Sequence, residues 1–225
     1  MEPAEILEKV QIPPANRHVS IRTAEGRFLR RWIEEHNVHR TLEIGLAYGM
    51  SAAWIASAHS GTHTCIDPFQ ARSFDDLGLK NLETLGLLER VEFHQGFSHE
   101  VLPRLLAEKK TYDLAFIDGS HLYDTILVDF FYVDRLLEMG GYVLFHDAWM
   151  RSTQLVASFV RRNRRDYQEV RTPERNLIVF RKVGRDERRW YHFREFYTLR
   201  RLGSYWVVVW SQRHGWLDRL RFRRE

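Results

Sequence analysis

The sequence predicts an α/β protein built on a doubly wound sheet. From residue 40 onward, short β-rich apolar runs alternate with helix-length amphipathic stretches, the pattern of a parallel sheet with crossover helices. The last two apolar runs are separated only by the five residues 172–176, too few for a crossover, so they predict an antiparallel hairpin. Glycine or acidic residues follow the first two runs, where open parallel sheets bind ligands.

Seven strands are expected, five of them parallel, with the hairpin closing the sheet. Such a sheet is Rossmann-like, but its antiparallel closing strands distinguish it from a plain dinucleotide-binding fold. The predicted strands are Thr41–Ile44, Thr62–Ile66, Val91–His94, Leu114–Ile117, Tyr142–Phe145, Tyr167–Arg171 and Leu177–Val183.

Amphipathic stretches predict the helices around this sheet. Residues 1–39 look helical with a break at Pro13-Pro14, and apolar residues at helical spacing predict a helix over Thr23–Glu35. Gly140-Gly141 is expected to end the helix before the fifth strand and to reverse the chain. The remaining predicted helices are Ser51–Ala58, Phe74–Leu85, Glu100–Glu108, Tyr123–Leu137 and Thr153–Arg164.

The length of 225 residues suits one domain with terminal additions. We expect an N-terminal helical cap (1–39), a ligand-binding core (40–183) and an aromatic, arginine-rich C-terminal extension (184–225). No apolar run approaches the roughly 20 residues of a membrane span. The N-terminus starts acidic without an apolar signal core, and the single Cys65 excludes an internal disulfide framework. These features favour a cytoplasmic protein.

Arginines gather toward the C-terminus of a chain whose net charge is +4. Such a tail would suit nucleic acid, an anionic membrane surface or an acidic substrate, but charge runs usually only face solvent. Aromatic residues lie among the arginines, and Tyr205 to Trp210 predict a strand or one side of a helix. We favour a packing element that supports a homodimer, and we expect neither nucleic acid nor a membrane as partner.

The loop after the first strand, Glu43-Ile44-Gly45-Leu46-Ala47-Tyr48-Gly49, predicts a ligand-binding turn. Its glycines permit a tight turn and close approach of a ligand. The loop lacks both the lysine of a triphosphate-binding loop and a full G-x-G-x-x-G pattern. The Glu43 carboxylate suits a ligand's ammonium group, whereas the alternative is a glycine turn that only caps the helix near Ser51.

Two further loops suit a nucleoside. Asp67 follows the second strand, where a carboxylate can accept both hydroxyls of a ribose, and its alternative role is a helix N-cap. Gly96-Phe97-Ser98 follows the third strand and can line an adenine ring, although Ser98 equally suits an N-cap. Three such loops at one sheet edge predict a binding site more strongly than any one of them.

The ends of strands four and five carry Asp118, His121, His146 and Asp147. Two roles are open for this set. Asp118, His146 and Asp147 would hold a divalent metal that lowers the pKa of an acceptor hydroxyl. Alternatively, His121 or His146 would take the hydroxyl proton as a general base beside Asp147.

With these motifs, residues 40–183 resemble the class I S-adenosylmethionine-dependent methyltransferases. The similarity is strongest to the branch of catechol-type and macrolide-sugar O-methyltransferases and cephalosporin-hydroxylase-type proteins, and rests on Asp118-Gly119-Ser120-His121 and His146-Asp147. It implies S-adenosylmethionine (SAM) as methyl donor and a small-molecule hydroxyl, on a natural product or sugar, as acceptor. The implied cofactor contacts are Glu43, Gly45, Tyr48, Gly49, Ser51, Asp67, Gly96, Phe97, Ser98 and Asp118.

The resemblance also bears on the reaction. Related metal-dependent enzymes place an acid after strand four and two acidic or amide groups after strand five; His146 departs from that pattern and weakens the case for magnesium. His121 resembles the catalytic base of the sugar enzymes. Tyr123, Trp149 and Met150 are expected in the acceptor pocket, and the helix acids Asp124 and Asp129 are expected to face solvent. The alternatives are methylation of nucleic acid or protein, and a non-catalytic binding subunit.

Overall fold

The computed structural model describes residues 1–196; the predicted element Tyr205–Trp210 and the last arginines lie outside the described residues. Its centre is a seven-stranded sheet in the order β3-β2-β1-β4-β5-β7-β6. Strands β1 to β5 pair in parallel, whereas β7 runs antiparallel to both β5 and β6. The predicted fold class is therefore confirmed. The strands are β1 (Thr41–Ile44), β2 (His63–Ile66), β3 (Val91–His94), β4 (Tyr112–Ile117), β5 (Leu137–Phe145), β6 (Tyr167–Val170) and β7 (Ile178–Lys182).

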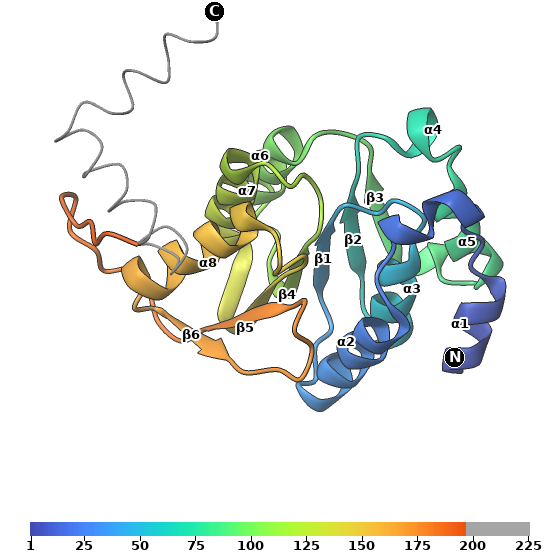
Figure 1. Ribbon diagram of the computed structural model, residues 1–225, viewed down its shortest axis with the longest axis horizontal. Helices are drawn as coiled ribbons and strands as arrows, with labels where there is room; N and C mark the ends of the chain where they lie inside the picture. The colour runs from blue at the N-terminus through green and yellow to red at the C-terminus, as the bar shows by residue number, and fades with distance from the viewer. Residues whose placement is uncertain (197–225) are drawn as a thin grey trace, which may run out of the picture.

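Helices cover both faces of the sheet (Figure 1). One face packs against α1, α2, α3 and α5, and the other against α6, α7 and α8. Among the described residues, no helix is both long and apolar enough to cross a bilayer. The helices are α1 (Pro3–Lys9), η1 (Pro14–Val19), α2 (Thr23–Glu35), α3 (Met50–Ser57), α4 (Gln70–Ser73), α5 (Leu77–Thr84), η2 (Leu88–Arg90), α6 (Ser98–Ala107), α7 (Tyr123–Leu136) and α8 (Arg151–Asn163).

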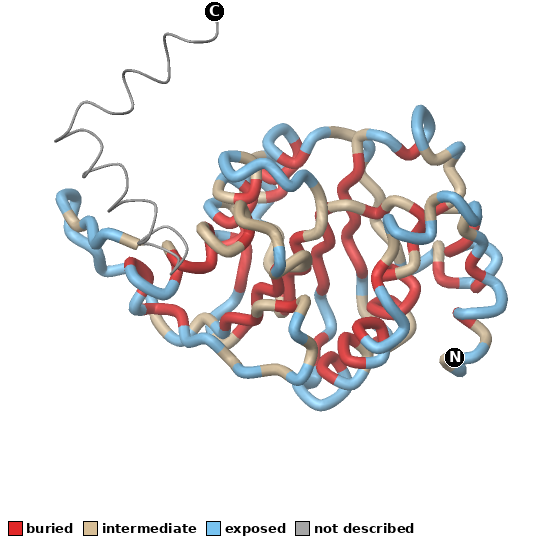
Figure 2. The backbone as a smooth tube through the Cα atoms, viewed as in Figure 1, coloured by how far each residue is buried: buried red, intermediate tan, exposed pale blue. Residues whose placement is uncertain are grey.

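Most residues of the central strands are buried, as Figure 2 shows along the centre of the sheet. Alternate residues of one strand join different cores: Leu114 and Phe116 pack with α2 and α3, whereas Ala115 and Ile117 pack with α6 and α7. Burial on both sides explains why these strands read as continuous apolar runs. It also leaves the loops at the carboxyl ends of the strands as the accessible part of the sheet.

Two predicted boundaries were wrong. The helix expected over Phe74–Leu85 begins only at Leu77, as α5, because Asp75 and Asp76 have φ angles of 51° and 55°, outside the helical range. Gly140-Gly141 does not end a helix, because α7 stops at Leu136 and β5 starts at once. The glycines lie in a bulge of β5 where its register against β4 shifts.

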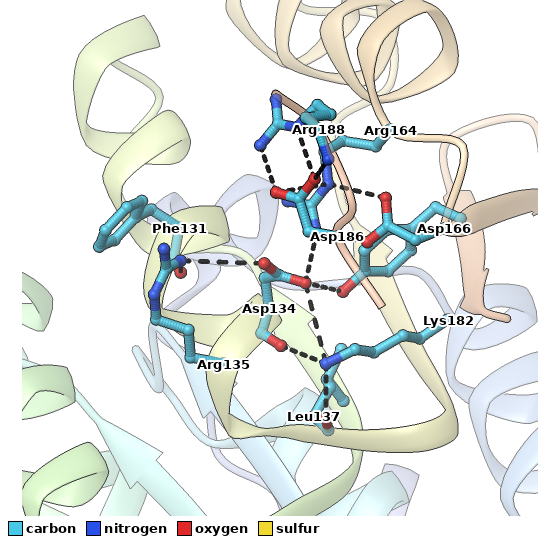
Figure 3. A network of polar contacts seen from close by, with 10 residues as sticks. Phe131, Asp134, Arg135, Leu137, Arg164, Asp166, Lys182, Asp186 and Arg188 are labelled. Carbon is cyan, nitrogen blue, oxygen red and sulfur yellow. Dashed lines mark hydrogen bonds and ion pairs between the residues drawn. The ribbon is translucent and has the colours of Figure 1, made fainter. Parts of the chain in front are cut away.

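A buried polar network fastens the closing hairpin to the end of α7 (Figure 3). Arg164 Nη2 lies 2.7 Å from Asp134 Oδ1 and 2.6 Å from Asp166 Oδ2. The Tyr167 hydroxyl donates to Asp134 Oδ1 at 2.9 Å, and Lys182 Nζ donates to the Asp134 carbonyl oxygen at 2.6 Å. The network links β6 and β7 to the end of α7.

Candidate active site

The glycine loop after β1 is pressed against the end of β4. Gly45 has a φ angle of 97°, and a Cβ atom on it would lie only 2.3 Å from the Asp118 carbonyl oxygen. Gly49, with a φ angle of 74°, is the N-cap of α3. Both positions require glycine, for the close approach and for the left-handed backbone respectively. The loop therefore has the tight turn that the sequence predicted.

Asp67 fixes this loop from the neighbouring strand. Its Oδ2 accepts hydrogen bonds from the backbone N–H groups of Leu46 and Ala47 at 3.0 and 2.8 Å. Its Oδ1 accepts one from the Phe69 N–H at 2.7 Å. A carboxylate oxygen can accept more than one hydrogen bond, so Oδ1 retains capacity for a ligand hydroxyl. Asp67 is thus both a loop anchor and an available acceptor.

Glu43 is fully buried within the sheet. His63 Nε2 lies 2.8 Å from Glu43 Oε2, and His63 Nδ1 lies 2.8 Å from Thr41 Oγ1. The second oxygen, Glu43 Oε1, has no hydrogen-bond partner among the described residues. A buried carboxylate oxygen without a partner is costly, so this atom suits a donor supplied by water or by a ligand's ammonium group.

Tyr48 and Ser51 are buried near the loop. The Tyr48 hydroxyl accepts a hydrogen bond from the Asn16 side chain, and its ring packs edge-on against Phe74. The side chain of Tyr48 thus faces the N-terminal segment, and Ser51 lies in the first turn of α3. The N-terminal residues therefore cover one flank of the glycine loop.

The loop after β3 places an aromatic ring at the surface. The Phe97 ring is about half exposed and meets the ring of Phe69, which follows β2, in a T-shaped contact with centroids 5.9 Å apart. Gly96 precedes it, and Ser98 begins α6 with its side chain buried. The pair of rings forms an apolar rim near Asp67, which suits the flat base of a nucleoside.

Asp129 was expected to face solvent, and this expectation was wrong. It is fully buried on the side of α7 that carries Ile126 and Phe130. Burial raises the pKa of Asp129 to about 6, against the opposing effect of the neighbouring Ser98 hydroxyl. The apolar residues three positions before it and one after it already place Asp129 in the buried stripe of the helix, a signal that the sequence contained.

The raised pKa of Asp129 predicts a pH-dependent cost to folding. Below pH 4 the carboxyl group is protonated in both states, whereas above pH 6 the folded protein must ionise a buried group. Asp129→Asn has no proton to lose. The free energy of unfolding of Asp129→Asn, relative to that of the wild type, should therefore rise by about 2 kcal/mol between pH 4 and pH 8.

Urea denaturation at a series of pH values measures this difference. Asp124→Asn is the matched control, because Asp124 is exposed in the same helix. We expect its stability relative to the wild type to vary by less than about 1 kcal/mol over the same range. If the free energies of unfolding of Asp129→Asn and the wild type differed by the same amount at every pH, the prediction would be contradicted.

His146 joins residues from four parts of the chain. Its Nδ1 lies 2.9 Å from Asp118 Oδ1, and its Nε2 lies 3.4 Å from Glu25 Oε2 and 3.2 Å from Asn176 Nδ2. Burial opposes a charge there, but hydrogen bonds with Asp118, Asp147 and Glu25 raise the pKa of His146 to about 12. A role as base or as metal ligand requires a neutral ring nitrogen, and these surroundings favour the imidazolium form.

His121 forms a second pair with Asp147. His121 Nε2 lies 2.7 Å from Asp147 Oδ2, and the histidine side chain is 43% exposed. Hydrogen bonds from His121 and His146 hold the pKa of Asp147 well below its usual range. The same hydrogen bond to Asp147 raises the pKa of His121. An exposed imidazole oriented by a carboxylate through one nitrogen is the arrangement of a general base.

A cavity of about 390 Å³ opens beside this cluster. Trp149 lines it as expected, whereas Tyr123 and Met150 do not. Glu25 and Asn176 were missed because they lie far from His146 in the sequence. The lining residues are His18, Ser20, Arg22, Glu25, His146, Asp147, Trp149, Arg175 and Asn176.

A divalent ion would find donors in the same place. Asp118, His121 and Asp147 each offer one atom, and the three atoms lie within 4.8 Å of one another. This set differs from the expected one by containing His121 in place of His146. Two carboxylates with an imidazole suit a transition-metal ion better than magnesium.

Residues 42–148 match a family model described as a methyltransferase domain. This segment covers slightly less than half of the 225-residue chain. It contains the glycine loop, Asp67 and all four of the acid and histidine residues after β4 and β5. The match agrees with the resemblance to methyltransferases that the sequence analysis described.

Curated relatives of the methyltransferase domain include caffeoyl-CoA O-methyltransferases. The protein from Populus kitakamiensis is 26% identical over 136 residues, which cover 56% of this chain and 54% of the relative. Caffeoyl-CoA O-methyltransferase 1 of Zea mays is 30% identical over 124 residues, covering 53% of this chain and 46% of the relative. The chain spans about half the length of these relatives.

Solved structures share the fold at low identity. The O-methyltransferase TomG from Streptomyces achromogenes, in complex with SAM, has a TM-score of 0.67 and 20% identity over 81% of this chain and 91% of that one. The O-methyltransferase from Bacillus cereus in complex with SAH has a TM-score of 0.65 and 18% identity, covering 81% and 90% of the two chains. Both support the architecture described above.

Proposed function

We propose that the protein is a SAM-dependent O-methyltransferase that acts on a hydroxyl group of a small molecule. The observation that carries the proposal is the His121–Asp147 pair, which lies at the carboxyl ends of β4 and β5 within a methyltransferase domain. The relatives named above are O-methyltransferases, and the TomG and Bacillus cereus structures contain SAM and SAH. The cavity of about 390 Å³ has the size of a small-molecule site.

The cofactor would occupy the edge formed by the first three loops. The glycine loop at Gly45 and Gly49 allows close approach to the methionine part, and Glu43 Oε1 is an unpartnered acceptor behind it. Asp67 Oδ1 suits a ribose hydroxyl. The Phe69 and Phe97 rings and Ser98 suit the adenine. Gly45 packs against Asp118, so Asp118 is the member of the acid and histidine cluster that adjoins the cofactor edge.

His121 would serve as the general base. Its Nε2 is bound to Asp147, while its Nδ1 makes no hydrogen bond within the described residues and is free to take the acceptor's hydroxyl proton. Bound SAM would supply the methyl group to the resulting oxyanion and would leave as SAH. His146 would fix Asp118 and Asp147 through its two carboxylate contacts and would not itself exchange protons.

A divalent ion remains part of the proposal. Held by Asp118, His121 and Asp147, it would lower the pKa of the acceptor hydroxyl. The predictions of a homodimer and of a cytoplasmic location also stand as predictions.

Transfer of the labelled methyl group of SAM tests the proposed function. The purified chain is incubated with SAM and, separately, with a panel of catechols and sugars, with RNA and with a mixture of proteins. We expect label in small-molecule acceptors only. Label in RNA or protein but in none of the small molecules would contradict the assignment to small-molecule hydroxyls.

A further inference from the structure

One arginine in the acceptor cavity has no counter-charge. Arg175 lines the cavity beside Asn176, is exposed, and makes no hydrogen bond or ion pair with any residue that the structure describes. Arginine carries a permanent charge and a planar set of five N–H donors that matches carboxylate and phosphate groups. An arginine that is free at the wall of a ligand site is therefore available for an anionic part of the ligand.

The other charges of the cavity are already paired. Arg22 donates two hydrogen bonds to Glu25 Oε1, from Nε at 2.8 Å and from Nη2 at 2.5 Å. His146 lies between the carboxylates of Asp118, Asp147 and Glu25. The positive and negative charges of these groups neutralise one another. Arg175 therefore carries the remaining positive charge at the mouth of the cavity.

The loop that carries Arg175 is held in place on both sides. The Ala148 N–H donates to the Asn176 carbonyl oxygen at 3.2 Å, and the Leu177 N–H donates to the Glu174 carbonyl oxygen at 3.1 Å. The Asn176 amide also lies 3.4 Å from Asp147 Oδ1. Arg175 thus lies one residue from a group that contacts Asp147, and Asp147 lines the same cavity and pairs with His121.

We infer that the methyl acceptor is an anionic hydroxy compound whose carboxylate or phosphate group binds Arg175 while its hydroxyl faces His121. This inference rests on the proposed function and adds the chemical class of the acceptor. The Trp149 indole, which lines the same cavity, offers an apolar face to the body of such a molecule.

Calorimetric titration with three ligands that share one catechol ring tests the inference. Caffeate presents a carboxylate, caffeoyl-CoA presents phosphates, and methyl caffeate is the neutral match of the free acid. Each is titrated into the full chain with and without SAH. We expect caffeate or caffeoyl-CoA to bind about ten- to a hundredfold more tightly than methyl caffeate, the usual gain from hydrogen bonds to a charged group. A preference for caffeate identifies a carboxylate as the bound group, and a preference for caffeoyl-CoA alone identifies a phosphate.

Arg175→Gln should abolish this preference, because glutamine keeps donors but loses the charge. Arg171→Gln is the matched control, since Arg171 is exposed in the same hairpin and does not line the cavity. Equal affinity for the three ligands, no binding of any of them, or a preference that survives Arg175→Gln would overturn the inference. SAH binding in the same titrations reports separately on the proposed function, because Arg175 does not lie at the cofactor edge.

Discussion

His121→Gln should lower kcat for methyl transfer by about 100- to 10,000-fold, the usual contribution of a general base, while SAM affinity stays within about twofold of the wild type. Glutamine preserves size and polarity but cannot take a proton. The effect is confined to kcat because His121 contacts Asp147 and the acceptor side of the site, and no residue of the glycine loop. Steady-state kinetics with the best acceptor from the panel, together with calorimetry for SAM, measures both quantities.

His39→Gln is the matched control for this substitution. His39 is exposed and precedes β1, at the opposite edge of the sheet from the proposed site. Its kcat should equal that of the wild type. If His121→Gln retained more than about a tenth of the wild-type kcat, the base would have to be another group and the role given to His121 would be wrong.

Arg164→Ala should lower the free energy of unfolding by about 3 to 5 kcal/mol, because it removes the buried cation of Asp166 and leaves Asp134 only the longer contacts with Lys182 and Arg135 at 3.8 Å. Arg164 is only 3% exposed and binds Asp134 and Asp166, which are 9% and 4% exposed. Figure 3 shows these side chains converging between α7 and the hairpin. Urea denaturation followed by circular dichroism measures the loss.

Arg161→Ala provides the comparison, because Arg161 lies in the last turn of α8, just before Arg164, the C-cap of that helix. Arg161 pairs with Glu169 at 2.5 Å, but both side chains are 39% exposed. A solvent-exposed ion pair contributes about 0 to 1 kcal/mol, so this variant should stay close to the wild type. Equal losses in the two variants would show that burial of the Arg164 network does not determine its contribution.

The sequence predicted the sheet well because each strand is a short apolar run that ends at a polar or glycine residue. Strands β1 and β3 were placed to the residue, and the antiparallel hairpin followed from the shortness of its loop. Gly140-Gly141 was misplaced because a β-bulge and a helix end use the same residue type. Only the pairing of β5 with β4 shows that Gly140-Gly141 forms a bulge and not a helix end.

The site was predicted in part, for a similar reason. Residues that follow strand ends were found, since the carboxyl ends of parallel strands meet at one edge. Glu25, Arg175 and Asn176 were missed as members of the site because tertiary packing alone brings α2 and the hairpin loop to His146. The protonation state of His146 also depends on those partners, so the sequence alone could not predict its positive charge.

The central claim is that the loops after β1, β2 and β3 bind SAM, and calorimetric titration of SAM into the purified chain tests it most directly. We expect one SAM molecule to bind per chain, and Asp67→Ala to weaken binding about tenfold or more, because the loop anchor and the ribose acceptor are lost together. Absence of binding at millimolar SAM, or undiminished binding by Asp67→Ala, would contradict the claim.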